Sequence, residues 1–231
     1  MRTLRHSIVL IAMLLVVPVV AGADPIAAGD VVKFSDLPGN TGGGEFKLTV
    51  NGNAADWFIT FCLQKTEYMD FTSTFIVGSI NNYTLTDPNG SFASGGRGGV
   101  GGQDPISSQT AWLYTQFRNG TLSGYDFNGT FAQRQASANA LQHAFWGLED
   151  EEALDANNYF VKLAKQYTPS DFGTGKVQVL NLFRYSSTAP GHIGAEAQDQ
   201  LTIKTPEPST LALLGTGLVG IFARRRRSSR A

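Results

Sequence analysis

Residues 130–148 read TFAQRQASANALQHAFWGL, and this stretch decides the fold class. Thr130, followed three residues later by Gln133, has the pattern of a capping box, which predicts that a helix begins here. Apolar residues then recur at spacings of three, four and three: Ala138, Leu141, Phe145 and Leu148. This periodicity is typical of a helix with one buried face, so the middle of the chain is predicted to be helical.

Strand patterns lie on both sides of this helix. Short runs rich in β-branched and aromatic residues, bounded by turn residues, predict strands over 31–34, 45–50, 57–63, 74–80, 176–185 and 200–204. Two more helices are predicted, one from Asp104-Pro105 to Asn119-Gly120 and one capped by Asp155. Strands at both ends of one core, with a central group of about three helices, predict an α+β domain.

The first 23 residues have the features of a secretory signal peptide. Arg2 and Arg5 precede an apolar core from Ile8 to Val20, and small residues follow it up to Ala23. We therefore expect cleavage between Ala23 and Asp24. This leaves a single extracellular domain over residues 24–204 and a separate tail over residues 205–231.

The tail has three parts in order. Pro206-Glu207-Pro208 is followed by an uncharged apolar stretch, 211–223, and then by an arginine block, 224–227. At about 1.5 Å per helical residue the apolar stretch reaches only about 20 Å, short of a hydrocarbon core of roughly 30 Å. We expect a short membrane segment whose arginines remain on the cytoplasmic side.

This order of parts resembles the PEP-CTERM sorting signal of Gram-negative bacteria. The resemblance implies that an exosortase-type membrane transpeptidase recognises Pro206, Glu207 and Pro208. The membrane stop would be formed by Arg224, Arg225, Arg226 and Arg227. It also implies export across the inner membrane, anchoring through the C-terminus, and a final place at the cell surface or in the extracellular matrix. The alternative is an ordinary C-terminal anchor with an accidental Pro-Glu-Pro.

The charges of the chain are unevenly placed, although the 18 Lys+Arg and 19 Asp+Glu nearly balance. Seven of the basic residues and one acidic residue, Glu207, lie in the two ends, which leaves 11 basic and 18 acidic residues in the body. No basic patch is visible in that body, which argues against nucleic acid as a ligand. Cys62 is the single cysteine, so the chain cannot form an internal disulfide.

Two local patterns form a candidate reactive pair. Cys62 lies on a predicted strand, where alternation places it on the same face as Phe58, and Gln142 lies on the central helix. Together, Thr60-Phe-Cys-Leu-Gln64 and Gln142-His-Ala-Phe-Trp146 resemble the Cys-Gln thioester domains of bacterial surface adhesins. The resemblance implies a thioester between Cys62 and Gln142. It also implies water-excluding or packing neighbours at Phe61, Ala144, Phe145 and Trp146.

Other interpretations of this pair remain open. Cys62 can be a small buried hydrophobe beside an ordinary helix glutamine, a free reactive thiol, or half of an intermolecular disulfide. A hydrolase pair of Cys62 and His143 lacks an orienting partner in the sequence. The acidic run 149–152 is predicted to be a solvated helix end, and the glycine-rich residues 87–105 a surface loop.

These patterns predict an exported surface or matrix protein that binds amine-bearing targets covalently and serves in adhesion or biofilm formation. A non-covalent structural or binding module of the envelope, with Cys62 simply buried, is the alternative, and a hydrolase of envelope polymers is the third interpretation. The expected partners are an exosortase, the membrane and an unknown surface ligand. We expect no enzyme activity, no cofactor and no metal site.

Overall fold

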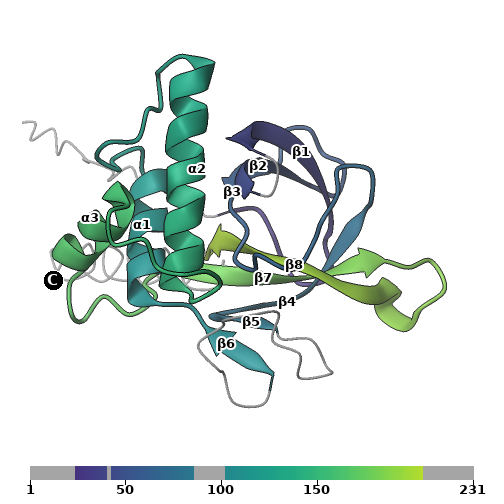
Figure 1. Ribbon diagram of the computed structural model, residues 1–231. Helices are drawn as coiled ribbons and strands as arrows, with labels where there is room; N and C mark the ends of the chain where they lie inside the picture. The colour runs from purple at the N-terminus through teal and green to yellow at the C-terminus, as the bar shows by residue number, and fades with distance from the viewer. Residues whose placement is uncertain (1–23, 41–42, 86–101, 205–231) are drawn as a thin grey trace, which may run out of the picture.

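The computed structural model describes residues 24–40, 43–85 and 102–204. The predicted signal peptide, the sorting tail and most of the predicted glycine-rich loop lie outside these residues. Within them, strands come first and last along the chain and three helices lie between, which confirms the predicted α+β class (Figure 1). No helix of this described part is both long and apolar enough to cross a membrane.

The main sheet has six strands in the spatial order β3-β2-β1-β4-β7-β8, and neighbouring strands are antiparallel. Its strands are β1 (Val31–Asn40), β2 (Gly43–Val50), β3 (Trp57–Thr60), β4 (Phe75–Asn81), β7 (Val177–Tyr185) and β8 (Ile193–Ile203). A short separate pair is formed by β5 (Tyr83–Leu85) and β6 (Gln103–Pro105), and one 3-10 turn, η1 (Pro190–His192), precedes β8.

The two edges of the main sheet meet just after β3. Cys62 forms an isolated bridge with Gln200 of β8. Beside it, the backbone N–H of Leu63 donates to Asp199 at 3.0 Å, and that of Leu201 donates to Phe61 at 3.1 Å. The sheet therefore closes on itself at residues 61–63. The predicted strand 57–63 is correspondingly shorter as a regular element, because only this bridge continues it beyond Thr60.

Three helices gather on one side of the strands: α1 (Ser108–Arg118), α2 (Phe131–Leu148) and α3 (Tyr159–Tyr167) (Figure 1). The predicted start of α2 is confirmed, because Thr130 and Gln133 form both hydrogen bonds of a capping box. The predicted apolar face is also confirmed, since its four residues are buried. Local signals were sufficient here because capping and periodicity act within a few turns.

Two predicted helix starts are wrong. Asp104-Pro105 belongs to β6, and α1 begins after Ser107, whose hydroxyl accepts from the backbone N–H of Thr110. The cap of α3 is Asn158, not Asp155. In both places a second good cap follows three residues later, and the packing of the whole chain selects it. The last strand also begins earlier than predicted, at Ile193.

The buried apolar residues form two clusters. The helix-side cluster lies between the helices and the sheet and includes Phe61, Leu113, Leu141 and Phe145. The strand-side cluster is formed mainly by residues of the sheet and includes Leu48, Phe58, Cys62 and, from α2, Trp146. Helix α2 thus contributes residues to both clusters. Its Trp146 lies in the strand-side cluster together with Cys62.

Candidate functional site

Cys62 lies at the junction of β3 and β8. Its side chain is fully buried, and it belongs to the same cluster as Phe58, which confirms the predicted strand face. Burial raises the pKa of the Cys62 thiol well above its usual range, because a thiolate there would lose its hydration. The sulfur is therefore held in its neutral form in the resting protein.

The carboxamide of Gln142 lies directly against Cys62. Cys62 Sγ donates to Gln142 Oε1 at 3.2 Å, and Gln142 Nε2 donates to the backbone carbonyl of Cys62 at 2.8 Å. The backbone N–H of Gly44 also donates to Oε1, at 3.3 Å. The fold thus brings together two side chains 80 residues apart in the chain, and only 1% of Gln142 is exposed.

Strand β2 approaches helix α2 closely at this pair because Gly43 has no side chain. A Cβ atom at Gly43 would lie 2.4 Å from Cγ of Gln142 and 2.7 Å from Cη2 of Trp146. Gly44 has a φ of +128°, a backbone conformation that other residues rarely adopt. The two glycines therefore allow the end of β2 to lie on the Gln142 carboxamide.

An ion pair that sequence reasoning missed holds β2 against α2. Glu45 is fully buried beside Gly44, and Arg134 of α2 donates to its two carboxylate oxygens at 2.8 Å each. Tyr125 donates its hydroxyl to the same carboxylate. Burial, together with the Glu45 charge, raises the pKa of Tyr125. A bidentate pair is geometrically specific, so it sets the position of Gly44 relative to α2. Glu45 alternates with Lys47 and Thr49 along the strand, a pattern that predicts a solvated face, so no sequence signal marks this contact.

Only one of the four predicted neighbours of the pair shares its cluster. Phe61, Ala144 and Phe145 lie in the helix-side cluster, where the rings of Phe61 and Phe145 meet edge to face with centroids 5.3 Å apart. Trp146 lies with Cys62 in the strand-side cluster, and its indole N–H has no hydrogen-bond partner among the described residues. Sequence neighbours point to different faces, which separates these residues in space.

The acidic run after α2 is not the solvated helix end that the sequence predicted. Glu149 is buried and accepts from the backbone N–H and the hydroxyl of Ser107. Glu151 accepts from the backbone N–H of Lys65 at 3.0 Å. Burial raises the pKa of Glu151 to about 7, and neighbouring carboxylates add to the shift. The run therefore joins the C-terminal end of α2 to the segment after Cys62.

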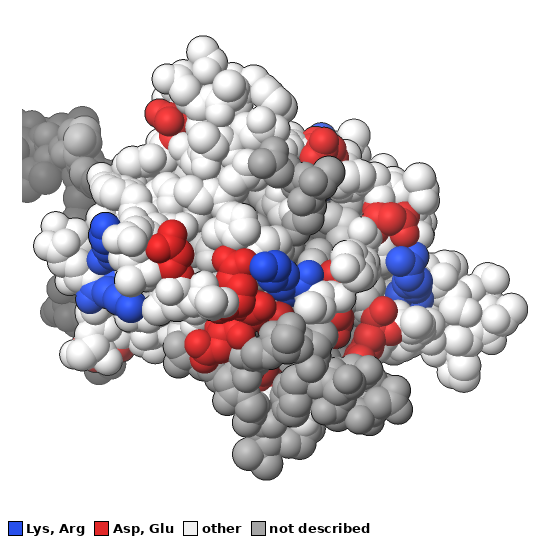
Figure 2. Space-filling view, viewed as in Figure 1, with Lys and Arg blue, Asp and Glu red and all other residues white. Residues whose placement is uncertain are grey.

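His143 faces the surface and does not form a hydrolase pair with Cys62. Its ring nitrogen Nδ1 lies 2.8 Å from a carboxylate oxygen of Glu152, which also binds the ammonium group of Lys65 at 2.6 Å. Both His143 and Lys65 contact the Trp146 ring from outside the site. Figure 2 shows acidic side chains gathered below the C-terminal end of α2, with a basic group beside them.

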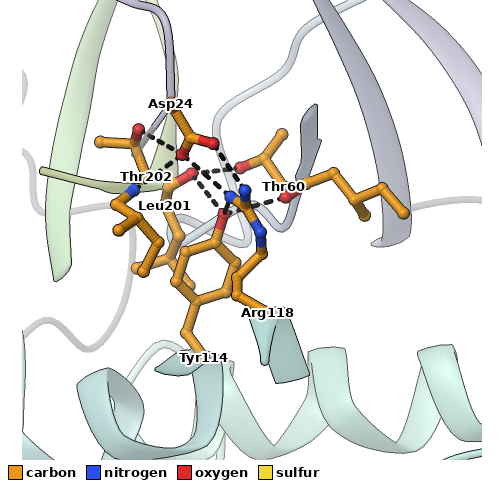
Figure 3. A network of polar contacts seen from close by, with 8 residues as sticks. Asp24, Thr60, Tyr114, Arg118, Leu201 and Thr202 are labelled. Carbon is orange, nitrogen blue, oxygen red and sulfur yellow. Dashed lines mark hydrogen bonds and ion pairs between the residues drawn. The ribbon is translucent and has the colours of Figure 1, made fainter. Parts of the chain in front are cut away.

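Asp24, the expected first residue of the mature chain, lies in a second buried network (Figure 3). Arg118 of α1 donates to both of its carboxylate oxygens, at 2.6 and 2.9 Å. The hydroxyl of Thr202 and the backbone N–H of Ile203 donate to the same carboxylate at 2.8 Å each. Arg118 also donates to the hydroxyl of Tyr114. The start of the described domain is thereby tied to its last strand.

Comparison with known proteins gives a match at the end of the chain. Residues 204–227 match the family model of the PEP-CTERM protein-sorting motif, a range that includes Pro206, Glu207, Pro208 and the arginine block. No curated protein and no solved structure matches the chain. The comparisons give no support to the resemblance with thioester adhesins. The chain carries the C-terminal sorting signal of exported proteins that an exosortase processes.

Proposed function

We propose that the body of this exosortase-sorted protein stores a thioester between Cys62 and Gln142 and uses it to attach covalently to an amine on a surface or matrix target. The observation that carries the proposal is the buried contact between the Cys62 sulfur and the Gln142 carboxamide, 3.2 Å from sulfur to oxygen. A sulfur and an acyl group in contact, away from water, are what such a bond requires.

Formation of the thioester needs no cofactor. The sulfur of Cys62 attacks the carbonyl carbon of Gln142, a C–S bond forms and the C–N bond breaks. The amide nitrogen leaves as ammonia and takes the thiol proton. The Gly44 N–H, 3.3 Å from Oε1, is placed to hold the negative charge that develops on that oxygen. The Cys62 carbonyl orients the departing nitrogen.

Burial then protects the stored acyl group. Water that cannot reach the thioester cannot hydrolyse it, so the bond persists until the site opens locally. An amine that enters forms a C–N bond to the Gln142 carbonyl carbon, and the C–S bond breaks to release Cys62 as a thiol. Each molecule reacts once, so the protein acts as a covalent binder and not as an enzyme.

The mass of the exported protein tests this proposal. Protein purified from a Gram-negative host is expected to weigh one ammonia less than its processed sequence, as defined by its N- and C-terminal peptides. Proteolysis is expected to release the peptide of Cys62 joined to that of Gln142. Methylamine should then give an adduct on Gln142 and a free thiol on Cys62. A protein of full sequence mass, whose thiol titrates freely on unfolding, contradicts the proposal.

Three variants separate the thioester from other causes of a mass change. Cys62→Ala and Gln142→Ala should each have full sequence mass and no methylamine adduct. Gln135→Ala is the matched control, because Gln135 lies on the same helix and donates to the backbone carbonyl of Gly39 at 2.7 Å. This variant loses a contact with the same β1–β2 hairpin but should keep the ammonia deficit.

A non-covalent binding module is the second candidate function. An open hollow of about 350 Å³ is lined by Trp57, Phe127, Arg118 and Arg134 among others. Trp57 is exposed there, and the Lys47 ammonium lies over its ring at 4.8 Å. The Cys62→Ala variant distinguishes the two functions in the cell. Adducts of the protein with surface material that survive denaturing electrophoresis are lost if attachment is through the thioester, and binding to that material is unchanged if Cys62 is only a core residue.

A further inference from the structure

Trp146 brings an unpaired polar group into the core. Only 4% of its surface is exposed, and Nε1 has no hydrogen-bond partner in the described part of the chain. A buried donor without a partner destabilises the fold, and phenylalanine would avoid this cost at the same position. The buried indole N–H therefore indicates that Trp146 has a function other than packing.

The surroundings of Trp146 indicate which atom this donor serves. Trp146 packs in the same cluster as Cys62, and its ring and the Gln142 side chain both border the space left by Gly43. The indole N–H acts on the Cys62 sulfur without forming a regular hydrogen bond to the neutral thiol: it favours the thiolate and so offsets part of the burial effect on the pKa of that thiol. Glu151 is the charged group whose field acts on this sulfur, and it disfavours the thiolate. The favourable contribution from a side chain thus comes from Trp146.

We infer that the Trp146 indole N–H stabilises the Cys62 sulfur whenever it carries negative charge, both as it attacks Gln142 and as it leaves during transfer to an amine. The inference rests on the proposed thioester. It assigns to Trp146 the acceleration of thioester formation and of transfer to the amine.

The physical reason lies in the difference between a thiol and a thiolate. A neutral thiol is a weak acceptor, so the indole N–H is poorly satisfied in the resting state. A thiolate is a strong acceptor, so the same donor is well satisfied while charge develops on sulfur. An interaction that is stronger in the transition state than in the ground state accelerates the reaction. The Gly44 N–H stabilises negative charge on the Gln142 oxygen, and the Trp146 N–H stabilises it on the Cys62 sulfur.

The variant Trp146→Phe tests this role, because it keeps an aromatic ring and removes the N–H. The rate at which methylamine opens the thioester is expected to fall at least about tenfold, the loss expected for a hydrogen bond to a charged group. The midpoint of urea unfolding should stay the same or rise, because an unpaired donor has been removed. A residue that served packing alone would instead lower stability and leave the rate of the folded protein unchanged.

Trp112→Phe is the matched control. Trp112 lies on α1 and is partly buried against the helix-side cluster, whereas Cys62 lies in the strand-side cluster. This variant should open at the wild-type rate. Equal slowing in both variants would overturn the inference, because the effect would then not depend on the indole at Cys62.

A second measurement covers the case in which Trp146→Phe does not fold. Biosynthetic replacement of tryptophan by its benzothiophene analogue keeps the bicyclic shape and lacks the N–H, and it should slow opening by a similar factor. A wild-type rate with either replacement overturns the role of Trp146 and leaves the thioester standing. The absence of an ammonia deficit in the wild-type protein overturns both.

Discussion

Burial changes the chemistry of Cys62 and of Glu151 near the site. Desolvation raises the pKa of both groups. For Cys62 this holds the sulfur neutral, so in the proposed reaction a charge on the sulfur depends on fixed donors such as Trp146. For Glu151 it brings the pKa to about 7, so the charge beside the site changes across the neutral range.

Replacing Glu151 with glutamine should change how stability depends on pH. In the unfolded chain Glu151 titrates near 4.5, and in the folded protein near 7, so the folded state binds more protons between these values. Its stabilising contribution is complete below about pH 4.5 and is lost as the pH rises through 7.

Relative to wild type, Glu151→Gln should therefore gain free energy of unfolding from pH 5 to pH 8. We expect about 1–2 kcal/mol, because solvent screens this partly exposed group. Urea unfolding of both proteins at the two pH values measures the difference. A difference that does not change with pH would be inconsistent with the raised pKa.

At the scale of elements, the site depends on how closely β2 lies on α2. The bidentate pair of Arg134 with Glu45 and the absence of a side chain at Gly43 together fix this spacing. The helix itself is defined locally, by its capping box and its apolar face. Its distance from β2 is a property of the contact between the two elements.

Gly43→Ala should separate the two elements. The new Cβ atom would overlap with Gln142 and Trp146, and overpacking of this kind costs about 1–3 kcal/mol of stability. We expect a smaller fraction of molecules with the ammonia deficit, measured by intact mass. Thr130→Ala is the control, since loss of the α2 cap should cost about 1 kcal/mol while the deficit remains. Equal deficits in the two variants would show that the spacing does not matter.

At the scale of the whole molecule, Asp24 ties the expected start of the mature chain to the end of β8. Ile203 pairs with Asp24 through two hydrogen bonds: its backbone N–H donates to the Asp24 carboxylate at 2.8 Å, and its carbonyl accepts from the Asp24 backbone N–H at 3.2 Å. The matched sorting motif begins at residue 204, directly after this strand. The two ends of the domain therefore leave it at the same place.

Asp24→Asn should destabilise the domain strongly. It removes one partner of a buried ion pair and leaves the Arg118 guanidinium without its charge partner, a change that costs about 3–5 kcal/mol. Asp70→Asn is the control, because Asp70 and Arg184 form an exposed pair at 2.9 Å and should contribute far less. Thermal unfolding of the two variants measures the contrast, and similar losses would contradict the importance of burial.

The sorting motif predicts a different phenotype. A variant with Pro206→Ala and Pro208→Ala should escape exosortase processing and remain membrane-bound with its C-terminus intact. Membrane fractionation with mass analysis of the C-terminal peptide measures this. Pro190→Ala, in the turn before β8, should be processed normally. Normal processing of the double variant would remove the sorting role from these prolines.

The sequence by itself determined the features that depend on near neighbours. Capping and periodicity defined α2, alternation placed Cys62 on the face of Phe58, and the order of Pro-Glu-Pro, apolar stretch and arginines defined the sorting tail. Through its resemblance to Cys-Gln thioester domains, the sequence also identified Cys62 and Gln142 as a candidate pair. These signals act over a few residues, so they can be read without the fold.

Only the tertiary structure decided the features that depend on distant segments. It selected Ser107 and Asn158 as caps over Asp104 and Asp155, and it brought the Gly44 N–H onto the Gln142 oxygen. It also placed Phe61 and Phe145 in the helix-side cluster and Cys62 in the strand-side cluster. Contacts between residues far apart in the chain depend on how whole elements pack, and side-chain volume, ion pairs and sheet closure settle that packing together.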